Sequence, residues 1–233
     1  MNEDGIEEVE EVDDPRGHRE RLRERLLKGG PDALLDHELV EFLLTLTIPR
    51  IDTKPMAKRF IKEFGGIGPL LCADGETLMR AGLSERAACA IKIAEVAALR
   101  MLSAQLSDQP ILSSWQALLD YLRADMAHRS VERVRILHLN SKNRLIRDEL
   151  VSEGSIDQAA IHVREVIRRA LDLGSASLIL VHNHPSGDPA PSRQDIELTR
   201  EIVNAGKPLG IVVHDHVVIG EATHSSMRSM GLI

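Results

Sequence analysis

The sequence predicts two domains, an all-helical N-terminal domain followed by an α/β C-terminal domain. Its 233 residues exceed the usual length of a single domain, and 43% of them are hydrophobic, which is enough for a buried core. Apolar residues recur at helical spacing in the first part of the chain, whereas strand-like alternation begins near residue 131. We expect an acidic tail at 1–14, a helical domain at 15–106, a linker at 107–114 and an α/β domain at 115–233.

Charge is distributed unevenly along the chain. Eight acidic residues and no basic residue fall within 1–14, whereas the rest of the chain carries 29 basic and 28 acidic side chains. An acidic run of this kind is typical of a solvated, disordered segment. The remainder is too weakly basic to indicate nucleic-acid binding by charge alone.

Targeting and cysteine signals predict a soluble cytoplasmic protein. The N-terminus lacks the basic start and apolar run of a signal peptide. No apolar stretch approaches the roughly 18–20 residues of a membrane span. Cys72 and Cys89 are the only cysteines, which excludes both a disulfide framework and a thiolate zinc site.

Helical periodicity predicts five helices in the N-terminal domain. Gly65 and Gly66 are a stop signal for the third helix, and Asp74 with Thr77 opens the fourth. The expected helices are 16–28, a segment around 38–47, 54–64, 73–81 and a long helix that begins at Ser84 and Glu85.

Beyond the linker, the pattern changes to a mixture of helices and strands. Helices are expected at 115–122, 162–173 and 192–205, with a short helix in the C-terminal tail. Strands are expected at 131–140, 145–153, 176–181, 209–214 and 217–219, with a polar turn at 141–144 and a Pro/Gly-rich loop at 183–191.

The chemically informative segment is 182–195, which reads HNHPSGDPAPSRQD. His182 and His184 are two residues apart at the end of an expected strand, so their side chains point to the same side. Asp195 falls in the first turn of the next helix, where the helix N-terminus favours the ionised carboxylate. Two imidazoles and one carboxylate, with a fourth position open, match the ligand set of a catalytic zinc site.

Simpler interpretations of the same residues stay open. Ser192 and Asp195 have the spacing of a helix capping box, and a His-x-His pair by itself is a weak signal. The letters His-Asn-His also name a nuclease family, but that family spreads these residues over separate elements. A second pair, His214 and His216, lacks a downstream acid, so we expect it to form a structural turn or to support the first pair.

The segment resembles the JAMM metalloprotease signature, which is His-x-His, seven residues, Ser, two residues and Asp. The full string is similar to the RadC family of bacterial proteins, and the likeness covers nearly everything after the acidic tail. The resemblance implies a JAMM-type α/β domain, cytidine-deaminase-like with a mixed sheet and flanking helices, preceded by a helix-hairpin-helix-like domain. It also implies that His182, His184 and Asp195 hold a Zn²⁺ cofactor.

The resemblance further assigns two catalytic residues. A JAMM enzyme uses a glutamate from an earlier strand as its general base, and the matching position is Glu132 at the start of the first expected strand. Ser192 would donate a hydrogen bond to the developing oxyanion, or would simply cap the following helix. The sequence leaves three rival acids in place, which are Glu149, Glu153 and Glu165.

The helical half departs from the pattern that the resemblance implies for DNA binding. A helix-hairpin-helix domain contacts the DNA backbone through the amides of a Gly-x-Gly hairpin, but here the second glycine is Ser84 and the acid Glu85 follows. Arg19 and Arg23 lie on a first helix in which glutamates are interleaved. We therefore expect no more than a weak DNA association through 15–106.

These features bear on three candidate functions. The leading hypothesis is a zinc-dependent hydrolase of JAMM type that cleaves a peptide or isopeptide amide in a peptide or protein substrate. The alternative is a DNA-associated repair or recombination protein whose metal site is structural or vestigial. A non-catalytic scaffold conflicts with the presence of all three ligands. No hypothesis involves a membrane.

Overall fold

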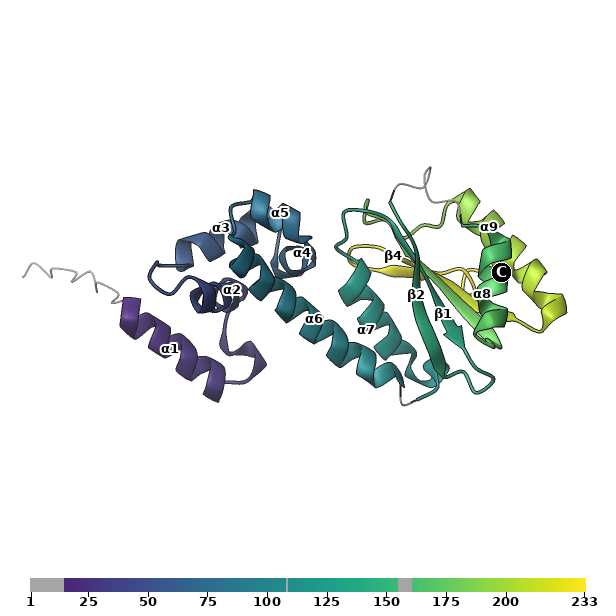
Figure 1. Cartoon of the computed structure of the whole chain (residues 1–233), viewed down its shortest axis with the longest axis horizontal. Helices are drawn as coiled ribbons and strands as arrows, with labels where there is room; N and C mark the ends of the chain where they lie inside the picture. Colours follow the sequence, from purple (N-terminus) through teal and green to yellow (C-terminus); the bar gives the residue numbers. More distant parts are fainter. Residues whose placement is uncertain (1–14, 108, 155–160) are drawn as a thin grey trace, which may run out of the picture. The chain divides into compact units, whose positions relative to one another are not determined.

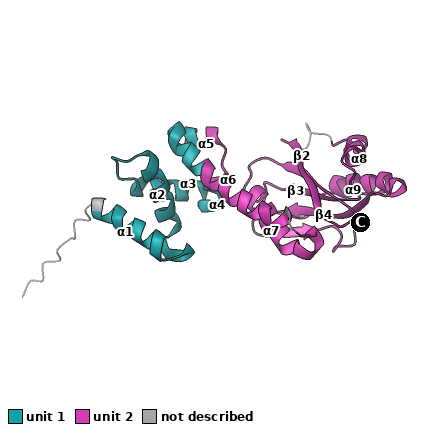
Figure 2. Cartoon of the chain, turned by 60° about the horizontal axis from the view of Figure 1, so that its bottom comes forward, with its two compact units in different colours: residues 1–70, 78–91 teal, residues 71–77, 92–233 magenta. Residues whose placement is uncertain are grey.

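The computed structural model describes residues 15–107, 109–154 and 161–233, so the predicted acidic tail lies outside the described residues (Figure 1). The chain divides into two compact units (Figure 2). The first comprises Met1–Leu70 and Leu78–Ile91, and the second comprises Leu71–Thr77 and Lys92–Ile233.

The N-terminal part of the chain is helical, as predicted. The structure has α3 at the predicted residues, and Gly65 ends it in the left-handed conformation with φ of 83°. A short helix at 67–72 was not predicted, because Gly66, Gly68 and Pro69 obscure its periodicity. The helices are α1 (Pro15–Lys28), η1 (Pro31–Ala33), α2 (Asp36–Thr47), α3 (Lys54–Phe64), α4 (Ile67–Cys72), α5 (Gly75–Arg80) and α6 (Glu85–Ser107).

The second unit is built around a mixed sheet of five strands in the order β2-β1-β3-β4-β5. β3 and β4 are parallel, and the other neighbouring strands are antiparallel. The elements after α6 are η2 (Ile111–Ser114), α7 (Trp115–Met126), β1 (Arg133–Leu139), β2 (Leu145–Glu153), α8 (Val163–Asp172), β3 (Ser177–Asn183), α9 (Arg193–Gly206), η3 (Lys207–Leu209), β4 (Val212–Ile219) and β5 (His224–Ser226).

Helices cover both faces of this sheet, with α7 on one side and α8 and α9 on the other (Figure 1). The central strand β3 is buried along its whole length. Its residues Ile179 and Val181 pack with α7, whereas Leu178 and Leu180 pack with α8 and α9. Among the described residues, no helix is both long enough and apolar enough to cross a membrane.

The predicted linker at 107–114 contains ordered structure. Helix α6 reaches Ser107, and η2 buries Ile111 in the core next to α7. The second half of α6 packs its leucines Leu99, Leu102 and Leu106 against the same core. This packing explains why the division between the compact units falls after Ile91, within α6. The predicted limits of the two domains, 15–106 and 115–233, stay predictions.

The C-terminal end differs from the prediction. The sequence predicts two strands at 209–214 and 217–219 and a tail helix, but the structure has one continuous strand, β4, followed by the short strand β5. The polar residue Asp215 does not break β4 because its carboxylate is paired inside the fold. It accepts hydrogen bonds from the Ser226 hydroxyl at 2.5 Å and from the Arg228 amide at 3.0 Å.

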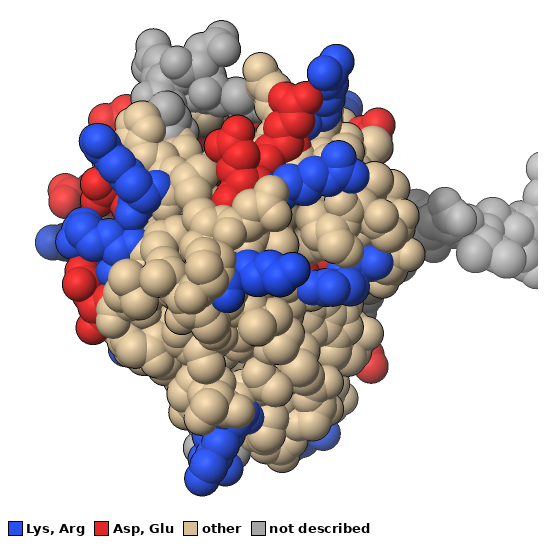
Figure 3. All heavy atoms as spheres, turned by 90° about the vertical axis from the view of Figure 1, so that its right-hand side faces the viewer, with Lys and Arg blue, Asp and Glu red and all other residues tan. Residues whose placement is uncertain are grey.

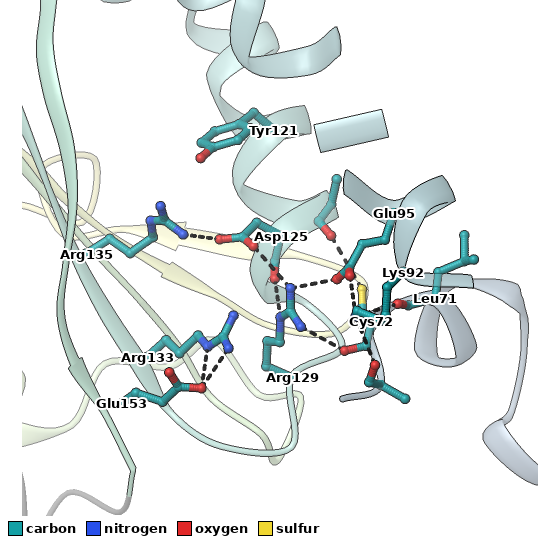
Figure 4. A network of polar contacts seen from close by, with 12 residues as sticks. Leu71, Cys72, Lys92, Glu95, Tyr121, Asp125, Arg129, Arg133, Arg135 and Glu153 are labelled. Carbon is teal, nitrogen blue, oxygen red and sulfur yellow. Dashed lines mark hydrogen bonds and ion pairs between the residues drawn. The ribbon is translucent and has the colours of Figure 1, made fainter. Parts of the chain in front are cut away.

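A buried ionic network joins the C-terminal end of α4 to α6, α7 and β1, within the second unit (Figure 4). Arg129 is 11% exposed and donates to the carboxylates of Glu95 at 2.7 Å and Asp125 at 3.2 Å. It also donates to the Cys72 carbonyl at 2.8 Å. Asp125 in turn pairs with Arg135 on β1. The guanidinium therefore compensates two carboxylates that are almost completely removed from water.

Charged residues at the surface form exposed ion pairs, in contrast to the buried network around Arg129. On the side of the molecule that carries α8 and α9, acidic and basic side chains are interspersed, and neither sign forms a continuous patch in the coloured part of Figure 3. On α8, Arg168 pairs with Glu165 at 2.9 Å and with Asp172 at 3.0 Å, and all three side chains are at least half exposed. Such pairs contribute little to stability.

Replacing Arg129 is expected to destabilise the protein much more than replacing Arg168. Arg129→Met leaves each buried carboxylate with one cationic partner, and we expect a loss of about 3 kcal/mol in the free energy of unfolding. Arg168→Met, the matched control, is expected to cost at most about 1 kcal/mol. Urea unfolding followed by circular dichroism measures both, and equal losses would contradict the role of the network.

A second prediction concerns the pH dependence of stability in the first compact unit, which is helical and is called the helical unit below. The hydrogen bond from Arg25 lowers the pKa of Glu38 to about 2. A carboxyl group with a depressed pKa stabilises the folded state above its unfolded pKa, and this stabilisation is lost as pH falls towards 2. Glu38→Gln is therefore expected to destabilise the protein at pH 7, and the difference from wild type should shrink between pH 5 and 3 in urea unfolding. A difference that stays constant would contradict the ion pair.

Candidate metal centre

The two histidines of the His-x-His motif lie together at the end of β3. His182 is the penultimate residue of the strand and is buried, and His184 follows directly after the strand. Their Nε2 atoms are 3.0 Å apart. The prediction that both rings point to the same side is therefore confirmed.

Asp195 joins this pair from the first turn of α9. Its Oδ2 atom lies 3.5 Å from His182 Nε2 and 3.8 Å from His184 Nε2. Burial by itself raises the pKa of Asp195, but a hydrogen bond from His182, when that ring is protonated at Nε2, and those from Ser192 outweigh it, so the pKa lies well below its usual range. The structure thus brings three predicted ligands together, one of them an ionised carboxylate.

A chain of hydrogen bonds fixes which nitrogen of His182 carries a proton. The Thr199 hydroxyl donates to the Asp195 carbonyl, so it accepts from His216 Nδ1 at 2.6 Å. Burial lowers the pKa of His216 well below its usual value, so the ring is neutral and its Nε2 atom accepts from His182 Nδ1 at 2.8 Å. In neutral His182 the remaining nitrogen, Nε2, therefore carries a lone pair.

His184 is oriented in the same way by a different acceptor. Its Nδ1 atom lies 2.7 Å from the Asp188 carbonyl, which only accepts, so this nitrogen carries the proton. The Nε2 atom of the neutral ring then also presents a lone pair.

The arrangement fits a metal ion. Two nitrogen lone pairs 3.0 Å apart repel each other unless a proton or a cation lies near both. The three ligand atoms are separated by 3.0, 3.5 and 3.8 Å. Ligands bound to zinc in a tetrahedron are separated by roughly 3.3 Å, given bonds of about 2.0–2.1 Å. The donor set and its spacing therefore suit Zn²⁺.

Glu132 lies next to this cluster, immediately before β1. It borders a cavity of about 230 Å³, which is also lined by His182 and Asp195. Burial raises the pKa of Glu132, and the neighbouring His182 and His184 partly oppose this. The carboxylate therefore lies beside the candidate ligands in a partly desolvated position.

The three rival acids have other partners. Glu149 pairs with Arg169 at 2.9 Å, Glu153 with Arg133 at 2.6 Å and Glu165 with Arg168 at 2.9 Å. None of the three lines the cavity that Glu132 shares with His182 among the described residues. The geometry favours Glu132, although its catalytic role stays a prediction.

Ser192 forms the predicted capping box. Its hydroxyl oxygen accepts from the Asp195 amide at 3.2 Å, and the Asp195 carboxylate accepts from the Ser192 amide at 2.7 Å. The sequence analysis gave capping and oxyanion stabilisation as alternative roles. The two roles are compatible, because capping uses the oxygen as an acceptor and leaves the hydroxyl proton available for donation.

Sequence reasoning missed Thr199 altogether and left two roles open for His216. The second His-x-His pair does not form a turn, since both of its histidines lie within β4. His216 supports His182, whereas His214 contacts Asn143 at 2.8 Å. A signal for Thr199 exists in hindsight, because it follows Asp195 by one helical turn and so faces the same direction.

The comparisons with known proteins agree with this geometry. Residues 112–232 match the RadC-like JAB domain family. The chain is also 47% identical over 213 residues to a UPF0758 protein of Rhodobacter capsulatus, an alignment that covers 91% of this chain and all of that relative. Its name states no activity. On these grounds the chain belongs to the RadC family, with a RadC-like JAB domain as its C-terminal part.

Proposed function

We propose that this protein is a zinc-dependent hydrolase of JAMM type that cleaves a peptide or isopeptide amide. The observation that carries the proposal is the grouping of the two Nε2 atoms with the Asp195 carboxylate, at separations of 3.0, 3.5 and 3.8 Å. Hydrogen bonds at the other ring nitrogens leave both Nε2 atoms available to a metal ion. A purely structural site closes its fourth position with another protein ligand, whereas here the cluster borders a cavity.

The residues around the cavity have complementary chemical roles. A zinc ion held by His182, His184 and Asp195 supplies Lewis acidity and lowers the pKa of water towards about 7. Glu132, with its raised pKa, takes a proton from water in the cavity and returns it to the departing amine. The Ser192 hydroxyl donates a hydrogen bond to the carbonyl oxygen as negative charge develops on it.

The lining of the cavity also suits a polypeptide substrate. Next to the charged residues its wall contains the apolar side chains Val134, Leu180 and Leu198. An apolar wall beside a few polar groups is typical of sites that bind an organic substrate. A peptide or protein is therefore the partner that we propose for the second unit.

The alternative, a DNA-associated protein with a structural or vestigial metal site, has less support. Ser84 already caps α6, since its hydroxyl accepts from the Ala87 amide at 3.3 Å. Arg19 donates to the carbonyls of Pro49 and Ile51, so this guanidinium is engaged within the helical unit. The hairpin amides of Gly82 and Leu83 also donate to carbonyls of the protein, at 3.0 and 3.1 Å. These amides and Arg19, one of the two arginines considered for phosphate contacts, thus have partners in the protein.

The metal site can be tested by elemental mass spectrometry of the purified protein. We expect about one zinc ion per chain, lost in the His182→Ala/His184→Ala double variant and retained in Glu132→Gln. A control double variant, His128→Ala/His224→Ala, should keep the metal. If the native protein holds no metal after zinc reconstitution and desalting, the hydrolase proposal is wrong.

The hydrogen-bond chain behind His182 predicts a specific loss of zinc affinity. Thr199→Val keeps the shape of the side chain but removes the acceptor for His216 Nδ1, so the proton order in the chain is no longer fixed. Zinc affinity, measured by competition with a chromophoric chelator, should fall about 10- to 100-fold. Thr45→Val in the helical unit is the control, and equal affinities for wild type and Thr199→Val would exclude this role.

A further inference from the structure

Asn183, the residue between the two candidate ligands, points away from them. Side chains alternate along a strand, so Asn183 faces the opposite side of β3 from His182. Its side chain is buried and makes two hydrogen bonds to the segment that precedes β1. Oδ1 accepts from the Arg133 amide at 2.8 Å, and Nδ2 donates to the Val131 carbonyl at 3.2 Å.

These two hydrogen bonds enclose a single residue, Glu132. We propose that Asn183 is a positioning residue that holds the Glu132 carboxylate beside the metal-binding histidines. This inference rests on the proposed function, because it assigns Asn183 a part in placing the general base.

The pairing of the strands explains why a side chain takes this role. The ladder between β1 and β3 ends at Val134 and His182. Beyond this point the backbone turns towards β4, where the His184 amide donates to the Ile219 carbonyl at 3.0 Å. The side-chain amide group of Asn183 then supplies one donor and one acceptor, as a peptide group does. It extends the pairing between the two strands by one step.

The Glu132 side chain depends on this support. Glu132 and Val134 share one face of the β1 segment, and Val134 lies opposite His182. The Glu132 carboxylate borders the cavity that His182 and Asp195 also line, and its position there depends on the backbone that carries it. That backbone is held by Asn183 on both sides and by the Gly154 amide, which donates to the Glu132 carbonyl at 3.0 Å.

A purely structural role for Asn183 predicts a different result. A buried amide that only satisfies its own hydrogen bonds affects stability when it is replaced, but it leaves the environment of Glu132 unchanged. A positioning residue changes that environment. The protonation midpoint of the Glu132 carboxyl group separates the two roles, and it can be measured without a metal or a substrate.

The experiment is ¹³C NMR of full-length protein labelled at the glutamate carboxyl carbons, after removal of metal with a chelator. The Glu132 signal is assigned by its loss in Glu132→Gln. Asn183→Leu keeps the volume of the side chain and removes both hydrogen bonds. Asn140→Leu is the matched control, because the Asn140 side chain accepts from two backbone amides at the turn between β1 and β2.

We expect the wild-type midpoint to lie above the ordinary glutamate value of about 4.3. In Asn183→Leu it should fall by at least about 0.5 pH units, as the carboxylate moves towards water. The Arg133 amide should lose hydrogen-exchange protection in the same variant. Asn140→Leu should change neither quantity. If Asn183→Leu does not fold, Asn183→Ser, whose hydroxyl is too short to reach both groups, replaces it.

Two results would overturn the proposal. One is an unchanged Glu132 midpoint in a folded variant that has lost protection at Arg133. The other is a loss of zinc affinity of tenfold or more in Asn183→Leu, which would mean that Asn183 acts on the ligands themselves. Failure of the native protein to take up zinc is a separate result, which refutes the hydrolase but leaves the metal-free titration valid.

Discussion

The candidate metal site depends on one constraint, which is the fixed direction of the hydrogen bonds that end at His182. The Thr199 hydroxyl has a single proton and donates it to a backbone carbonyl, so each later group in the chain has only one way to pair. The result is a nitrogen lone pair placed 3.0 Å from a second one. Such an arrangement is unfavourable by itself and favourable around a cation, so these residues could hold a metal ion.

The sheet provides the rigidity that this arrangement needs. β3 is buried between β1 and β4, and its register places His182 opposite both Val134 and Val218. Hydrophobic packing on both faces opposes a shift of β3 by one residue, because such a shift would turn the polar His182 into the apolar core beside α7. The two candidate histidine ligands therefore take their positions from a buried strand with a fixed register.

Around this strand, polar side chains complete what the backbone leaves unfinished. Asn183 continues the pairing where the ladder ends, and Asp215 anchors the residues that follow β5. On the α7 side, the Arg129 network satisfies carboxylates that the packing removes from water. In each case a buried polar group is paired, and at least one of its partners belongs to another element of the fold.

Local pattern was sufficient for much of this protein. The His-x-His spacing, the capping signal at Ser192 and the glycine stop after α3 depend on residues that are close in the chain, so the sequence determined the candidate ligands and most elements. It did not determine the continuity of β4, the ion pairs of Glu149, Glu153 and Glu165, or the hydrogen bonds that link His182 to His216 and Thr199. Those features depend on which distant side chains meet in the folded sheet, and only tertiary packing decides that.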